Sequence, residues 1–212
     1  MSSDAEEVEG LVARLRAGDE HALAALFARY QDPLRRMIDF RLDNRLNGRV
    51  SPSDVLQEAY IDAMKRVDHF LEKPEMPFFV WLRLVTAQRL VDVHRQHLGA
   101  QRRDAGQEVS IDRREPSAAT STCLARHLAA SQSSPSHAAI REESVARLEA
   151  VLESMDAIDR EVLALRHFEE LSNQQVAEVL GIDKAAASKR YVRALVRLKE
   201  ALSQLPDLID SG

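Results

Sequence analysis

The sequence has few of the residues that build strands, turns and covalent cross-links. Of its 212 residues, one is cysteine, seven are glycine, seven are proline and 5% are aromatic. The single cysteine, Cys123, excludes an internal disulfide framework and any metal site that needs several cysteines. Runs of β-branched residues bounded by turn dipeptides are also missing. Ala, Leu, Arg and Glu recur instead, and because they lose little on entering a helix we expect an all-α fold.

Long apolar runs are absent as well. No stretch approaches the roughly 20 apolar residues that span a bilayer, and the acidic N-terminus does not resemble a signal peptide. We therefore expect a cytoplasmic chain without membrane insertion. A glycine-rich phosphate loop and a nucleophile constellation are missing, and His94 and His97 have no third ligand in view. We therefore expect that the protein is not an enzyme, has no catalytic residues and binds neither a metal nor a cofactor.

Charge is unevenly distributed along this chain, whose net charge is −5. Residues 1–20 hold six acids and two arginines. Residues 83–103 hold five arginines and one aspartate, and residues 184–199 hold six basic residues and no acid. Two local basic stripes on an acidic chain predict that these two stripes contact phosphates. They also predict a separate partner that is not DNA.

Apolar periodicity divides the chain into three zones. Residues 8–103 and 141–205 are periodic, whereas residues 104–140 are rich in Ser, Ala, Gln and Pro. Such a composition buries too little apolar surface to offset its ordering entropy, although a short helix around Leu124–Ala129 is compatible with it. We expect two small helical domains joined by a flexible linker.

Helix boundaries are marked in the first zone. Asp19 can cap a helix that carries Leu23, Leu26 and Phe27. Pro33 is expected to kink or break this helix before a second segment, Leu34–Leu46. Ser51-Pro52-Ser53-Asp54 predicts the next helix start, and Pro74 and Pro77 bound a loop before a basic helix over Phe78–His97.

The helix that starts at Ser51 has one apolar stripe and one polar face. Val55, Ala59 and Ala63 belong to the stripe, and the opposite face carries Asp54, Gln57, Glu58, Ile61 and Lys65. Periodicity alone allows two interpretations of that face: a solvated surface with one stray apolar residue, or a protein-binding surface with acidic anchors.

The basic helix starts with Phe78, Phe79 and Trp81. Rings beside a basic track suit single-stranded nucleic acid, because bases stack on rings while the backbone follows the charge. Core packing is the competing role, and we expect it for at least two of the three rings. We expect four residues to lie away from the apolar side and to contact a DNA strand: Arg83, Gln88, His94 and Arg95.

Residues 172–199 have the pattern of a helix-turn-helix. Ser172 and Gln175 form a capping box, Gly181 supplies the turn and Asp183 caps the second helix. On the second helix we expect these residues to point inward: Ala187, Tyr191, Ala194, Leu195 and Leu198. We expect DNA contacts from Lys184, Ser188, Lys189, Arg190 and Arg193. A structural hairpin with a solvated basic face is the competing interpretation.

Three segments together resemble extracytoplasmic-function (ECF) RNA polymerase sigma factors. The segment from Asp54 to Met64 is similar to the helix that binds core polymerase, and Ala87–Arg95 is similar to the helix that opens the minus-ten element. Residues 155–168 and the helix-turn-helix are similar to the domain that reads the minus-thirty-five element. Arg89 stands where the family has Asn, and Ala187 where it commonly has Val.

The resemblance implies a non-enzymatic subunit that directs core RNA polymerase to its promoters. Asp54, Gln57 and Glu58 would then contact core polymerase, residues 8–103 would form region two, and residues 141–205 would form region four. Promoter DNA and core polymerase are the expected partners, and an anti-sigma factor is a further candidate. A response-regulator-like factor shares the helix-turn-helix but predicts an N-terminal α/β domain. A pure interaction module is disfavoured by the basic recognition helix.

Overall fold

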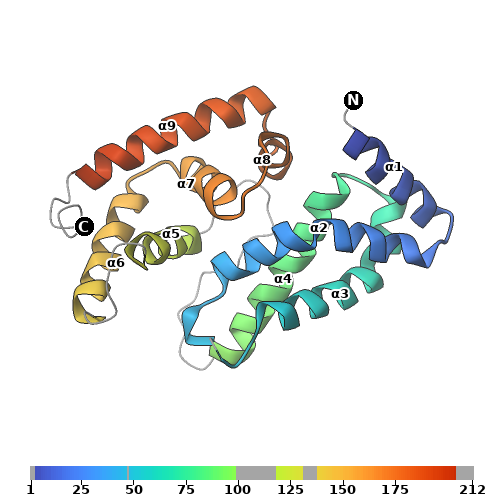
Figure 1. The fold of residues 1–212 in the computed structure, drawn as a ribbon, viewed down its shortest axis with the longest axis horizontal. Coiled ribbons are helices and arrows are strands. Elements are labelled where there is room, and N and C mark those ends of the chain that lie inside the picture. The colour runs from blue at the N-terminus through green and yellow to red at the C-terminus, as the bar shows by residue number, and fades with distance from the viewer. Residues whose placement is uncertain (1–2, 47, 99–117, 131–137, 204–212) are drawn as a thin grey trace. The chain divides into compact units, whose positions relative to one another are not determined.

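The structure, a computed structural model, describes residues 3–46, 48–98, 118–130 and 138–203. All secondary structure in these ranges is helical (Figure 1). The chain divides into two compact units, Met1–Gly106 and Gln107–Gly212. The expected all-α fold class is therefore confirmed for the described residues.

The first unit is built from four α-helices and one short 3-10 turn. In chain order they are α1 (Ser3–Arg16), α2 (Glu20–Arg41), η1 (Asn44–Leu46), α3 (Pro52–Glu72) and α4 (Phe78–Leu98). Helix α1 packs on α2, and α4 packs against both α2 and α3. The unit has one hydrophobic core, whose fully buried side chains include Leu26, Leu34 and Leu82.

The helix starts in this unit follow the capping signals of the sequence. The Asp19 carboxylate accepts a hydrogen bond from the His21 N–H at 3.0 Å. At α3, the Ser51 hydroxyl accepts from the Asp54 N–H, and the Asp54 carboxylate accepts from the Ser51 N–H, both at 3.1 Å. This capping box satisfies two donors that have no partner within the helix.

Pro33 does not break α2, contrary to expectation. The helix continues to Arg41, and its second half buries Leu34, Met37 and Ile38. A proline inside a helix removes one backbone hydrogen bond. Burying these side chains stabilises the helix by roughly 1.5–3 kcal/mol per residue, which outweighs that loss.

A buried ion pair joins α3 to α4. Asp62 lies on the inner side of α3 with its side chain 8% exposed, and its carboxylate accepts hydrogen bonds from Nε and Nη2 of Arg89, the Nε bond being 2.8 Å. Arg89 Nη1 also lies 3.6 Å from a Glu58 carboxylate oxygen. The Asp62 hydrogen bond raises the pKa of Arg89. The residue that departs from the sigma-factor pattern is thus the partner of a buried acid.

The described residues of the second unit form five α-helices and one π turn. Its elements are α5 (Ala118–Ala130), α6 (Ala138–Glu153), α7 (Ala157–Leu163), η2 (Ala164–Phe168, a π turn), α8 (Asn173–Leu180) and α9 (Lys184–Ser203). Helix α5 lies within the expected linker, 104–140. The remainder of that segment, apart from residues 138–140, lies outside the described residues.

Helix α5 is packed into the second unit. Leu124 and Ala125 are fully buried, and the buried Thr120 hydroxyl donates to the Glu161 carboxylate at 2.8 Å. Thr122 bonds in the same way to Glu149 of α6. The segment around α5 is polar in composition, but α5 itself contains Ala and Leu residues. The helix forms because these residues bury their apolar side on α6.

The helix-turn-helix has the expected caps. The Ser172 hydroxyl accepts from the Gln175 N–H at 3.2 Å, and the Gln175 side chain accepts from the Ser172 N–H at 2.9 Å. Gly181 ends α8 in the left-handed region, at φ 64°, and Asp183 accepts from the Ala186 N–H at 2.8 Å. These contacts fix the sharp turn between α8 and α9.

A second buried carboxylate holds α9. The Asp159 side chain is 2% exposed, and its two oxygens accept hydrogen bonds from Arg190 at 3.1 Å and from Arg197 at 2.6 Å. Both arginines belong to α9, two turns apart. The neighbouring Arg160 donates through Nη1 to the backbone carbonyls of Leu152 and Met155, where α6 ends. Helix α7 thereby connects the end of α6 to α9.

Replacing Arg89 should destabilise the first unit. Arg89→Met leaves the Asp62 carboxylate buried without its partner, so we expect the free energy of unfolding to fall by about 2–3 kcal/mol. The only tryptophan, Trp81, lies in this unit, so urea unfolding of the full chain followed by its fluorescence reports on this unit. The exposed Arg66→Met is the matched control. An Arg89→Met, Asp62→Leu double variant should recover much of the loss, and equal midpoints for Arg89→Met and Arg66→Met would contradict the role of the pair.

Replacing Asp159 should loosen α9 selectively. Asp159→Ala removes the acceptor shared by Arg190 and Arg197, so we expect amide hydrogen exchange to accelerate about tenfold in residues 190–200, which corresponds to about 1.4 kcal/mol. Glu200→Gln, which alters an exposed acid of the same helix, is the control. Unchanged exchange in Asp159→Ala would show that apolar packing alone holds the helix.

Candidate polymerase-binding and DNA-binding surfaces

The outer face of α3 carries the predicted polymerase contacts. Asp54, Gln57 and Glu58 are all exposed, and Ile61 on the same face is 43% exposed. Hydrogen bonds from Ser51 lower the pKa of Asp54, so its carboxylate is ionised at neutral pH. The face therefore combines two acids, an amide and an unpartnered apolar side chain.

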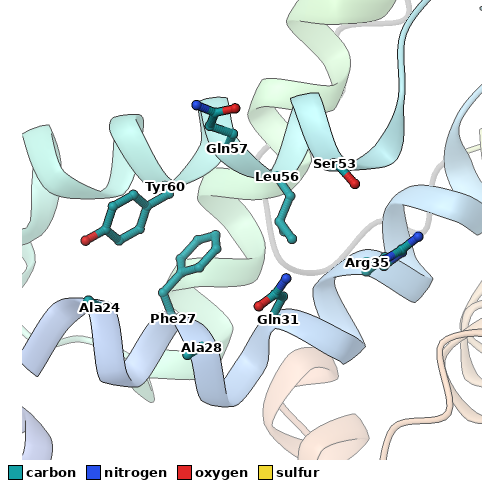
Figure 2. Close-up of a pocket in the computed structure, with 9 residues that line it drawn as sticks. All are labelled: Ala24, Phe27, Ala28, Gln31, Arg35, Ser53, Leu56, Gln57 and Tyr60. Carbon is teal, nitrogen blue, oxygen red and sulfur yellow. The ribbon is translucent and has the colours of Figure 1, made fainter.

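A groove between α2 and α3 lies beside this face (Figure 2). Its cavity volume is about 370 Å³. Phe27 extends from α2 toward Leu56 and Tyr60 of α3. The rings of Phe27 and Tyr60 pack edge to face, with their centroids 4.9 Å apart. Gln31, Arg35, Ser53 and Gln57 supply its polar lining. Such a groove can accept an apolar side chain from a partner. No pattern in the sequence predicts this groove, because it arises from the packing of two separate helices.

Arg83 is buried, which corrects the expectation that it lies away from the apolar side of the helix. Only 9% of its surface is exposed, and it lies in the same helix as the buried Phe79, Thr86 and Leu90. The buried side of α4 is wider than the apolar stripe that we expected from the sequence. Because α4 packs against two helices, α2 and α3, it buries a wider arc than a helix on the surface of a single layer.

The other three predicted residues of α4 have different environments. Arg95 is exposed near the end of the helix. Gln88 is half-buried and donates to the Asp92 carboxylate at 3.2 Å. His94 is also half-buried, and its Nε2 accepts a hydrogen bond from the Asp43 N–H at 3.2 Å. This histidine holds the segment between α2 and α3 against α4.

The aromatic residues at the start of α4 belong to the core. Phe78 and Phe79 are 5% and 3% exposed, which confirms the expectation of core packing for at least two of the three rings. Trp81 is half-buried and stacks on Phe70, with ring centroids 4.8 Å apart. All three rings are thus buried or half-buried.

Most of the predicted DNA contacts on α9 are exposed. Lys184, Ser188, Lys189 and Arg193 face solvent, while Ala187 and Ala194 are buried on the opposite side. The Ser188 hydroxyl accepts a hydrogen bond from the Asn173 side chain of α8 at 3.3 Å, which links the two helices of the motif. Arg190, expected to face DNA from the flank, is instead half-buried in its ion pair with Asp159.

Leu195 does not point inward as expected. It is 40% exposed and adjoins Val192 and Val196, which are 59% and 51% exposed. The ion pairs of Arg190 and Arg197 with Asp159 bring the arginine side of α9 toward the core, and Leu195 lies on the opposite flank. Tyr191 and Leu198 are half-buried.

Among the residues that the structure describes, no group of three or more His, Cys, Asp or Glu side chains is placed to hold a metal ion. None of the described helices has both the length and the apolarity that a membrane span requires.

Comparison with known proteins adds independent evidence. The family model for ECF sigma factors matches residues 5–204. The ECF RNA polymerase sigma factor SigD of Mycobacterium tuberculosis is 28% identical over 202 residues, which cover 95% of this chain and 87% of that protein. The RNA polymerase sigma-H factor of Pseudomonas aeruginosa is 26% identical over 201 residues, 94% of this chain and 96% of that one.

Among solved structures, the chain is similar to CnrH in complex with the cytosolic domain of CnrY. The identity is 24% and the TM-score 0.46, over 92% of this chain and 96% of that one. The family match covers nearly the whole sequence, including both helical units. The chain therefore belongs to the ECF sigma factor family, and is a transcription initiation factor that directs RNA polymerase to promoter DNA.

Proposed function

We propose that the first unit binds core RNA polymerase through the outer face of α3. The observation that carries this assignment is the exposure of two acids beside an apolar side chain, Ile61, and a groove. Asp54 and Glu58 would meet basic groups of the polymerase clamp and set the orientation of the complex. Ile61, Met64 and the groove would supply apolar burial, which contributes about 25 cal/mol per Å².

The recognition helix of the second unit is assigned to the minus-thirty-five element. Helix α9 would enter the major groove with its exposed N-terminal half, which carries Lys184, Ser188, Lys189 and Arg193. Arg190 has a different task in this account. Its ion pair with Asp159 fixes the rotation of α9 and thereby the direction in which Lys189 and Arg193 project.

The exposed edge of α4 is assigned to the minus-ten element. Arg95 would contact the DNA backbone and Gln88 a base edge, whereas His94 would act by positioning the neighbouring loop. Arg83 is left out of this surface because it is buried. With Phe78 and Phe79 in the core, bases would have to be held by polar contacts more than by stacking on these rings.

Region two is proposed to correspond to the first unit and region four to the second, including α5. The connection between their described parts is then residues 99–117, which is shorter than the expected linker of 104–140. The sigma factor would contribute recognition alone, and the polymerase would perform the chemistry in the cytoplasm, where its template lies.

Charge reversal on α3 should abolish the association with core polymerase. Asp54→Lys, Glu58→Lys places like charges against a basic clamp surface, and we expect binding to weaken at least 100-fold in a competition assay with purified core. Asp54 also belongs to the capping box, whose loss costs about 1 kcal/mol of stability.

A matched control separates these two effects. Ser51→Ala removes the hydroxyl that caps α3 but keeps both acids, so it should bind core as the unaltered protein does. Loss of binding by Ser51→Ala to the same degree would attribute the effect to the cap. Full binding by the charge-reversed variant would contradict the assignment of α3.

Removing Lys189 should change upstream recognition. A base contact contributes roughly 1–3 kcal/mol of discrimination, so Lys189→Ala should lower transcription 5- to 100-fold from promoters with the preferred upstream element and little from others. Lys199→Ala, an exposed lysine farther along α9, is the control. Run-off transcription from a pool of upstream sequences makes the comparison. A uniform loss across the pool would identify Lys189 as a phosphate contact instead.

A further inference from the structure

The segment between α2 and α3 is anchored to the end of α4. Its Leu42 and Leu46 are buried in the core, 8% and 0% exposed. Within the segment, the Leu46 carbonyl accepts hydrogen bonds from the N–H groups of Arg49 and Val50, at 2.9 and 3.1 Å. The Asp43 N–H donates to His94 in the last turns of α4. Figure 1 shows this segment beside the C-terminal end of α4.

Arginines recur at every fourth position from the end of α2 through this anchored segment. They are Arg41, Arg45 and Arg49, against one acid, Asp43. Arg45 is exposed and bonds to Asp43 through Nε at 3.1 Å and Nη2 at 2.8 Å, which compensates one positive charge. Arg49 is exposed at the end of the segment, and Arg95 is exposed on the adjoining turn of α4. We call Arg41, Arg45, Arg49 and Arg95 the end cluster, in which the exposed Arg49 and Arg95 supply the positive charge available to a partner.

We propose that the end cluster is a second phosphate-binding surface, which extends the DNA track of α4 onto the segment between α2 and α3. This inference rests on the proposed contact between Arg95 and promoter DNA. His94, next to Arg95 on α4, accepts a hydrogen bond from Asp43 of this segment. A DNA backbone that reaches Arg95 therefore also reaches the segment. Duplex DNA carries one negative charge per roughly 1.7 Å of axis, so one arginine more along the track adds one phosphate contact.

Two features favour DNA over a protein partner for this cluster. The described part of the segment exposes no large apolar side chain, whereas protein interfaces usually have an apolar centre. Its buried leucines and backbone hydrogen bonds hold the backbone of the segment in place, so little backbone entropy is lost when a phosphate binds.

The test is the salt dependence of promoter binding by the reconstituted holoenzyme. The probe is a chromosomal fragment of the host that the unaltered holoenzyme transcribes in run-off assays. For Arg49→Gln we expect the slope of log K against log salt to fall by about 0.9, and the affinity at 0.1 M salt to fall about fivefold. Arg49→Lys keeps the charge and should keep the slope. Arg16→Gln, which alters an exposed arginine in the last turn of α1, should also keep it.

Two side measurements make the outcome decisive. Core association and the urea midpoint from Trp81 fluorescence should be the same for Arg49→Gln as for the unaltered chain. An unchanged slope in Arg49→Gln overturns the inference, as does weaker core association with an unchanged slope, which would assign the cluster to polymerase. Failure of the unaltered holoenzyme to transcribe any chromosomal fragment would count against the proposed function itself, and would appear before any variant is compared.

Discussion

Each helical unit of this sigma factor depends on one buried carboxylate that is neutralised by arginines of the helix proposed to contact DNA. Asp62 pairs with Arg89 of α4, and Asp159 pairs with Arg190 and Arg197 of α9. A carboxylate that is 8% or 2% exposed needs such a partner, because an uncompensated charge in the interior costs several kcal/mol. The pairs therefore determine which side of each helix faces the core, and with it which side chains remain for DNA.

This constraint divides the basic residues of the chain between two tasks. Arg89, Arg190 and Arg197 hold helices in place, whereas Lys189, Arg193 and Arg95 project into solvent. A count of positive charges along α4 or α9 consequently overstates the number of phosphate contacts that either helix can make. For a chain with a net charge of −5, the placement of these few outward residues matters more for DNA affinity than the overall charge.

Local signals in the sequence were sufficient for the helix starts and the turn. The capping boxes at Ser51 and Ser172, and the left-handed Gly181, depend on neighbours within a few residues. The errors arose where distant residues decide. Pro33 stays inside α2 because its neighbours are buried, Arg83 is buried because α4 contacts two helices, and Leu195 is exposed because Asp159 draws the other side of α9 inward. Periodicity identifies an apolar stripe, but it does not reveal which polar residues pair across helices.

The central claim is that the buried pairs persist while the remaining basic residues engage DNA. A cryo-electron microscopy structure of the holoenzyme on a promoter fragment tests it most directly. The account predicts that Arg89 stays bonded to Asp62 and that Arg190 and Arg197 stay bonded to Asp159, with Lys189 and Arg193 at base edges or phosphates of the upstream duplex. A structure in which Arg190 or Arg89 leaves its aspartate to contact DNA would contradict it.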